Sequence, residues 1–161
     1  MDITWDDLTV NIDHVDSEML VKHWRWLIGD NMTPIMVSAI GDIFLRNYDD
    51  TIYWLETGVG ELNQVAENPA QFAEMLDDAY IIDEWFLPQL VADLKVKGIE
   101  LEPGKLYGFK QLPKLGGEYR ASNFSLVDIT KHFERTGKML FKLKDLPEGT
   151  TVDLDFNFDE D

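Results

Sequence analysis

Between residues 33 and 69, short apolar runs alternate with turn residues, and this pattern constrains the fold more than any other. The stretch reads TPIMVSAIGDIFLRNYDDTIYWLETGVGELNQVAENP, with interruptions at Gly41–Asp42, 47–50 and 58–60. Short runs separated by such turns predict three or four antiparallel strands joined by hairpin connections. The helices of the fold must therefore lie before and after this segment.

Two helices are predicted at the edges of this strand-rich segment. From residue 16 onward, apolar side chains recur at helical spacing, with Asp16 or Ser17 as the N-cap and Gly29 as the stop. Asn68–Pro69 begins the second helix, because proline fits the first helical turn.

The rest of the chain mixes helices and strands. A helix is predicted from about residue 82 to residue 97, and Pro88 in its interior implies a kink or a break into two helices. KLYGFK (105–110) and NFSLV (123–127) predict two further strands, and residues 128–146 predict a final helix weakened by Gly137.

The order of these elements is α-β-β-β-β-α-α-β-β-α, which is neither a regular βαβ repeat nor all-β. It predicts an α+β fold with a mainly antiparallel, twisted sheet and helices packed around it. The 161 residues suit one domain over 1–161, and the acidic residues 153–161 are expected to form an edge strand or a loose tail.

Charge is the strongest signal of the whole chain. There are 31 acidic and 14 basic residues: 20 and 5 in residues 1–100, 6 and 9 in residues 101–152, and 5 and none in residues 153–161. Such a field repels nucleic acid and anionic lipid and speeds encounter with basic proteins. We therefore expect a basic protein partner and no direct binding to nucleic acid or membrane, with solubility alone as the alternative explanation of the charge.

Several function classes are excluded or disfavoured. The chain has no cysteine, which rules out disulfides and thiolate sites, and it shows no signal peptide or apolar run of membrane-spanning length. A soluble, cytoplasmic protein is expected. No hydrolase, phosphate-loop or dinucleotide motif is present, and adjacent acids are expected by chance in so acidic a chain. We therefore predict no catalytic residue, no cofactor and no metal site.

The stretch LGGEYRASNF, residues 115–124, is the strongest candidate for a functional loop. Gly116–Gly117 allows positive φ, and the aromatic residues on either side of it favour strands. A turn between two strands is favoured over a ligand site.

Three stretches resemble a known family. GDIFLRNYDDTIYWLETGVGELNQVAENPAQF, LEPGKLYGFKQLPKLGGEYRASNF and KDLPEGTTV, spread between about Leu20 and Val152, resemble a bacterial domain of unknown function. That domain is best known as the C-terminal half of immunity proteins against type VI secretion DNase toxins. The first half resembles, more loosely, the SMI/KNR-type (SUKH) immunity superfamily, an α+β fold.

The resemblance implies a binding protein that occludes a toxin, not an enzyme. Within the motif, the candidate functional loop comprises Tyr107, Lys110, Gly116, Gly117, Glu118, Tyr119 and Asn123. Acidic and aromatic residues that would suit a basic partner are Trp24, Trp26, Asp49, Asp50, Trp54, Asp77 and Asp78. The alternative is a small hydrolase or ligand-binding protein that uses the loop from 107 to 123, with His132 as its base.

Overall fold

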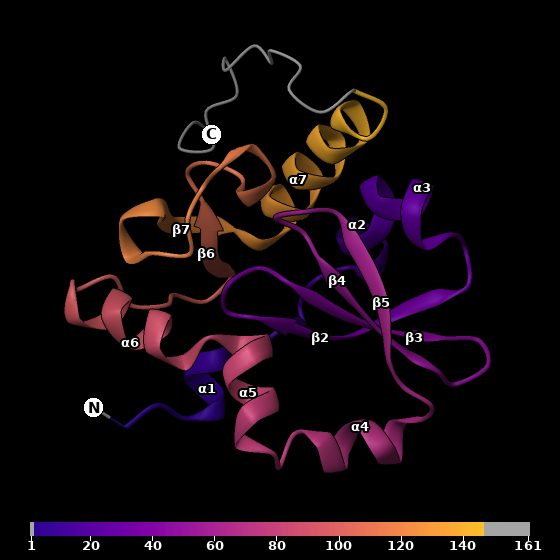
Figure 1. Ribbon diagram of the computed structural model, residues 1–161, viewed down its shortest axis with the longest axis horizontal. Coiled ribbons are helices and arrows are strands. Elements are labelled where there is room, and N and C mark those ends of the chain that lie inside the picture. Colours follow the sequence, from indigo (N-terminus) through magenta and orange to yellow (C-terminus); the bar gives the residue numbers. More distant parts are fainter. Residues whose placement is uncertain (1, 147–161) are drawn as a thin grey trace.

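The computed structural model describes residues 2–146, and the predicted acidic tail at 153–161 lies outside that part. A five-stranded sheet in the order β1-β2-β3-β4-β5 occupies the centre (Figure 1). Its strands are β1 (Thr9–Val10), β2 (Met32–Ser38), β3 (Ile43–Asn47), β4 (Ile52–Glu56) and β5 (Glu61–Ala66). Every neighbouring pair is antiparallel, so the strands β2 to β5 form the predicted meander.

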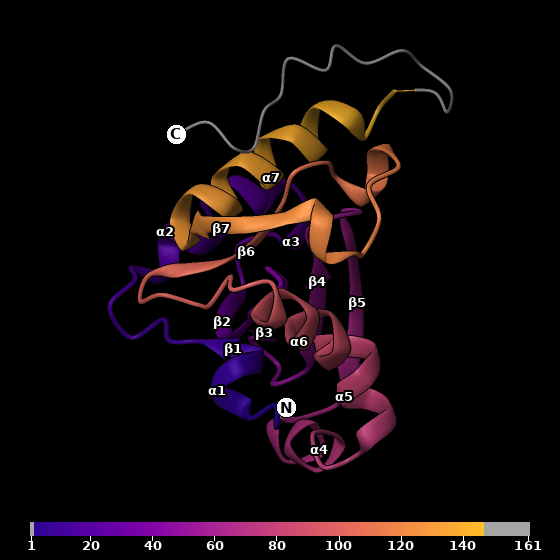
Figure 2. The same cartoon turned by 90° about the vertical axis from the view of Figure 1, so that its left-hand side faces the viewer.

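Helices cover both sides of this sheet. On one side lie α2 (Ser17–Val21), the 3-10 turn η1 (Lys22–Trp24), α3 (Arg25–Ile28) and the long α7 (Ile129–Leu143). On the other lie α4 (Pro69–Met75), α5 (Ala79–Phe86) and α6 (Pro88–Val96), with α1 (Trp5–Leu8) beside α6. Figures 1 and 2 show the two groups of helices with the sheet between them. The predicted α+β class with an antiparallel sheet is confirmed.

A second, two-stranded sheet packs against the first. Its strands β6 (Lys105–Phe109) and β7 (Phe124–Asp128) are antiparallel, and α7 follows β7 directly. The amide N–H of Tyr107 donates to the carbonyl of Ala39 at 2.7 Å, and that of Lys114 donates to the carbonyl of Gly58 at 2.9 Å. These bonds attach the small sheet and its loop to the turns at one end of the large sheet.

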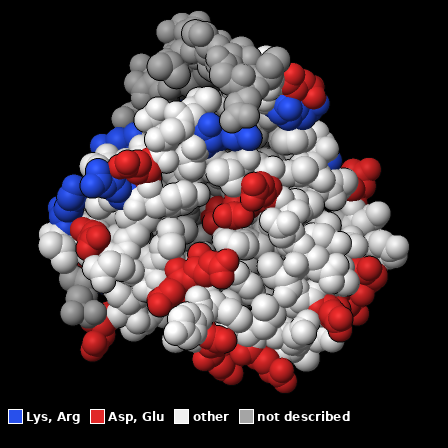
Figure 3. Space-filling model, viewed as in Figure 1, with Lys and Arg blue, Asp and Glu red and all other residues white. Residues whose placement is uncertain are grey.

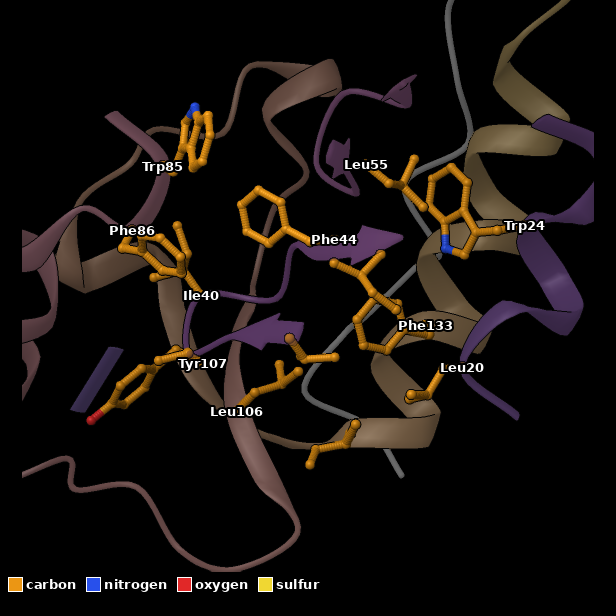
Figure 4. Packing of buried hydrophobic residues seen from close by; sticks show 14 of the residues in the cluster. Leu20, Trp24, Ile40, Phe44, Leu55, Trp85, Phe86, Leu106, Tyr107 and Phe133 are labelled. Carbon is orange, nitrogen blue, oxygen red and sulfur yellow. The ribbon is translucent and has the colours of Figure 1, made fainter. Parts of the chain in front are cut away.

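Strand β3 is buried on both faces, which explains why the core extends to both sides of the sheet. Ile43, Phe44 and Leu45 are all fully buried. The Phe44 ring packs against aromatic rings of α4 and α5, 5.2 Å from Phe72 and 5.3 Å from Trp85. Figure 4 shows Phe44 between Trp85 and Phe86 on one side and Leu55 and Trp24 on the other.

Local sequence signals account for most helix ends. The Asp16 side chain caps α2 by accepting from the amide of Glu18, and Asn68 caps α4, whose first residue is Pro69. Gly29, at φ 76°, ends α3. The helix predicted from residue 82 to residue 97 begins earlier, at Ala79, and is broken in two at Pro88. Pro88 starts α6 and disfavours the right-handed helical conformation for the residue before it. Leu87 adopts the left-handed conformation at φ 48° instead.

Candidate functional site: an acidic and aromatic cavity

The double glycine forms a bend whose conformation requires both residues. Gly116 has φ 95°, a left-handed value that a residue with a side chain rarely adopts. A Cβ atom at Gly117 would overlap the carbonyl oxygen of Gln111. The two glycines therefore serve different purposes: the first allows the turn and the second allows two backbone segments to touch.

Asn123 holds this bend together. Its Oδ1 accepts from the amide of Gln111 at 2.8 Å, and its Nδ2 donates to the carbonyls of Gln111 at 2.9 Å and Glu118 at 3.0 Å. One carboxamide thus satisfies three backbone groups of an irregular loop, which is a structural role.

The other residues of the predicted loop do not converge on one point. Tyr107 is fully buried, and its hydroxyl donates to the carbonyl of Ile99 at 2.6 Å. Lys110 is exposed, and Glu118 forms an exposed ion pair with Arg120 at 3.0 Å. Tyr119 lines a cavity that Tyr107, Lys110 and Glu118 do not reach, with its ring edge-on to Phe109 at 6.0 Å.

The tryptophans proposed as partner anchors differ in accessibility. Trp24 is fully buried and donates to the Thr136 hydroxyl at 3.3 Å, so it has no surface to offer a partner. Trp26 is half-buried, stacks on Trp24 at 5.5 Å and donates to the carbonyl of Gly137 at 3.3 Å. Trp54 is half-buried and lines the same cavity as Tyr119.

The four predicted acidic contacts lie in two separate turns, and three of them, Asp49, Asp50 and Asp78, have local roles. Asp49 and Asp50 are in the turn between β3 and β4, where Asp49 accepts from Thr51 and Asp50 pairs with Arg46 at 2.7 Å. Asp77 and Asp78 lie between α4 and α5, where Asp78 caps α5. Figure 3 shows exposed acids at the centre and lower edge of one face of the molecule, with Lys and Arg along its upper part.

His132 is a core residue. It is 1% exposed, and its Nε2 lies 2.8 Å from the carbonyl oxygen of Gly41 and 3.1 Å from the Thr57 hydroxyl. Since the carbonyl can only accept, Nε2 carries the proton and donates to it. Burial lowers the pKa of His132 to about 4, against a smaller opposing effect of the Gly41 carbonyl. The ring is therefore neutral at pH 7 and reaches no solvent-exposed substrate position.

The cavity that Tyr119 and Trp54 share is the best-defined candidate site. It has a volume of about 230 Å³ and lies where the end of β4, the α5–α6 junction and the loop after β6 meet. Aromatic and aliphatic side chains form most of its wall, and three carboxyl groups reach it. The lining residues are Ile40, Asp42, Trp54, Glu56, Glu84, Trp85, Leu87 and Tyr119.

Asp42 is the most perturbed carboxyl of this cavity. It is 5% exposed, and its Oδ1 accepts from the amide of Thr57 at 3.2 Å. Burial, helped by the charge of Glu56, raises the pKa of Asp42 to about 8, against the lowering effects of the Thr57 amide and the Trp54 indole. Trp54 Nε1 is buried and makes no hydrogen bond of good geometry among residues 2–146, so its effect on Asp42 is that of a nearby dipole.

The pKa values of Glu56 and Tyr119 are also raised in this cavity. Burial, together with the charges of Glu61 and Glu84, raises the pKa of Glu56. Burial also raises the pKa of the Tyr119 hydroxyl, with Asp42 and Glu56 as the next causes. The site thus combines one carboxyl that burial keeps protonated at pH 7, Asp42, with Glu56, whose ionised form is disfavoured by burial and by the neighbouring acids.

A wider cavity adjoins this one. It measures about 500 Å³ and shares Leu87 and Tyr119 with the smaller cavity, while Asp83 and Asp93 add two further acids to its wall. The two cavities therefore meet at Leu87, the residue whose positive φ separates α5 from α6.

Within residues 2–146, no group of three His, Cys, Asp or Glu side chains is arranged to hold a metal ion.

The sequence points to Trp54 and Tyr119 but not to the partners that complete the cavity. Asp42 falls in a predicted turn, and Glu56, Glu84 and Leu87 carry no distinguishing signal. These residues come from β4, from the α5–α6 junction and from the turn after β2, so only the tertiary fold unites them. The one local clue is Pro88, whose break in the helix positions Leu87.

A central part of the chain matches a known family. Residues 66–140 match the family model of the T6SS immunity protein Tdi1, C-terminal. The match covers α4 to most of α7, a shorter span than the resemblance read from the sequence, and includes Glu84, Trp85, Leu87 and Tyr119 of the cavity. Asp42, Trp54 and Glu56 precede the region that matches the Tdi1 model.

Comparisons with curated proteins and with solved structures concern the chain as a whole. No curated protein matches the chain. The crystal structure of Atu4351 from Agrobacterium tumefaciens superposes with a TM-score of 0.52 and 16% sequence identity, over 76% of this chain. The chain spans 64% of the length of Atu4351.

None of the helices within residues 2–146 combines the length and the apolar character that a membrane span requires.

Proposed function

We propose that this chain is a non-enzymatic immunity protein that neutralises a basic protein partner, such as a nuclease toxin, through an acidic surface. The observation that carries the proposal is the match of residues 66–140 to the Tdi1 immunity family. An immunity protein acts by binding a cognate toxin, so the partner is expected to be a protein.

The charge distribution supports a basic partner. Residues 1–100 carry 20 acidic and 5 basic side chains, and Figure 3 shows patches of exposed acids at the centre and lower edge of one face. A nuclease presents a basic groove to the phosphates of its substrate, and carboxylates on a second protein compete for the same groove. Long-range attraction of this kind accelerates association and weakens as salt increases.

The alternative of a hydrolase that uses His132 finds little support. The ring is buried, neutral at pH 7 and bonded to Gly41 and Thr57. Glu118 instead lies at the surface, where it pairs with Arg120. A catalytic base needs access to the proton that it removes, and this histidine has none.

Co-expression with the product of the neighbouring gene, which we expect to be the toxin, tests the proposal. We expect the chain to restore growth of cells that express the toxin and to form a complex with it in solution. The dissociation constant should rise by about tenfold or more between roughly 50 and 500 mM NaCl, because the attraction is between opposite charges. Failure to bind or protect would contradict the proposal, and an affinity unchanged by salt would contradict its electrostatic basis.

A further inference from the structure

The acidic and aromatic cavity has the composition of a receptor for a cation. Trp54, Trp85 and Tyr119 contribute aromatic rings, and Asp42, Glu56 and Glu84 contribute carboxyl groups. Aromatic faces attract cations through their quadrupole, and more strongly where water is excluded. A cation would relieve the repulsion between the carboxyl groups of Glu56 and Glu84 and would favour the ionised form of Asp42, which a neutral or anionic ligand would not do.

Two buried groups in the wall have unused hydrogen-bonding capacity. Trp54 Nε1 is buried without a hydrogen-bond partner in the described part of the chain. Asp42 is 5% exposed and receives one side-chain hydrogen bond in residues 2–146, from the Thr57 amide to Oδ1. Folded proteins rarely leave such groups unsatisfied. The Trp54 N–H can only donate, so its natural partner is the nearby Asp42 carboxyl. The remaining acceptor capacity of Asp42 points to a ligand that donates hydrogen bonds and carries positive charge. At pH 7 burial keeps Asp42 protonated, and a cation bound in the cavity would favour its ionised form and so strengthen its attraction for the Trp54 N–H.

The size of the cavity selects among cations. At about 230 Å³ it is smaller than the pockets of about 300–1,000 Å³ that enclose small-molecule ligands, but it suits a single side chain. A metal ion is disfavoured because no three potential ligands in residues 2–146 are suitably arranged. A guanidinium is flat, stacks on aromatic rings and offers five donors, whereas a lysine ammonium is compact and strongly hydrated.

We propose that this cavity receives an arginine side chain of the partner protein, held by Glu56, Glu84 and Asp42 and stacked on the aromatic wall. This inference rests on the proposed function for the identity of the partner as a basic protein. The cavity would then anchor the interface, since arginine in a desolvated pocket is a frequent hot spot of protein–protein binding. Its wider neighbour, with Asp83 and Asp93, lies beside the path along which the arginine-bearing segment would run.

A titration that needs no toxin tests the cavity first. N-acetyl-L-arginine amide is added to the ¹⁵N-labelled full chain, and the indole N–H signals of its five tryptophans are followed. We expect the Trp54 and Trp85 signals to shift at millimolar concentrations, and the signal of the fully buried Trp24 to stay in place. N-acetyl-L-citrulline amide has the same shape without the charge and should cause no shift.

Glu84→Gln is the informative variant, because Glu84 is exposed on α5 and we expect its replacement to keep the fold. It should weaken arginine amide binding and toxin binding by about tenfold, the loss expected for one charge-assisted contact. Glu74→Gln on α4 removes the same charge from an exposed site outside the cavity and should change either affinity by less than about twofold.

The outcomes separate this inference from the proposed function. Equal shifts with arginine and citrulline amides, or none with either, would overturn the arginine site. Such a result would not contradict toxin binding by another surface. Toxin binding that Glu84→Gln leaves unchanged would overturn the anchoring role. Shifts with arginine amide but no binding to the toxin would support the site and contradict the proposed function.

Discussion

The buried carboxyl of Asp42 should make the stability of this protein fall as pH rises through neutrality. Its pKa is about 8 in the folded protein, against an ordinary value of 3.8 for an exposed aspartate. Between these values the folded state keeps a proton that the unfolded state has released. Raising the pH therefore favours the unfolded state, by about 1.4 kcal/mol for each pH unit.

Replacement by asparagine removes this dependence. The new carboxamide would keep the size of the side chain and the Oδ1 atom that accepts from Thr57 at 3.2 Å. From about pH 5 to about pH 7.5, the free energy of unfolding of Asp42→Asn relative to the original protein should increase by about 3 kcal/mol. The raised pKa of Glu56 affects both proteins, so most of its contribution cancels in the difference.

Urea denaturation followed by tryptophan fluorescence at several pH values measures this difference. Asp13→Asn serves as the control, because Asp13 is an exposed carboxyl outside the cavity. Its effect on stability should be small and nearly constant with pH. A difference between Asp42→Asn and the original protein that stays constant over the same pH range would refute the burial of an unpaired carboxyl at this position.

Two further predictions concern the loop at residues 115–124. Gly117→Ala should lower the free energy of unfolding by about 3 kcal/mol, because the Cβ overlaps the carbonyl of Gln111, whereas Gly116→Ala adds only left-handed strain of about 1 kcal/mol. Chemical denaturation compares the two, and equal losses would contradict the different roles assigned to them. Asn123→Ala removes three hydrogen bonds to backbone groups and should cost about 2 kcal/mol, with faster amide exchange at Gln111. Unchanged exchange there would mean that the carboxamide does not hold the bend.

Local chemistry makes much of the fold predictable. Turn residues at regular intervals identify strands β2 to β5, and Asn68–Pro69 identifies the start of α4, because hairpin and capping preferences act over a few residues. Pro88 correctly implies a break in the helix that contains it. The short elements α1 and β1 escape prediction, since β1 has only two residues and little periodicity to detect.

The site is harder to predict because its residues meet only in three dimensions. Trp24 and Trp54 look alike in the sequence, yet the first is fully buried beside Thr136 and the second lines a cavity. Gly137, which weakens a helix in isolation, allows α7 to approach the backbone of His23 so closely that a Cβ would clash. Helix propensity describes the isolated segment, and here tertiary packing outweighs it.

The bonds that join the small sheet and α7 to the large sheet determine how the chain can be divided. Thr57 and Gly41 contact His132, Ala39 accepts from Tyr107, and Gly58 accepts from Lys114. In each case one partner lies inside residues 66–140 and the other lies before them. A protein cut at residue 66 would therefore lose the partners of all these bonds. Experiments on the region that matches the Tdi1 model should keep the preceding strands attached.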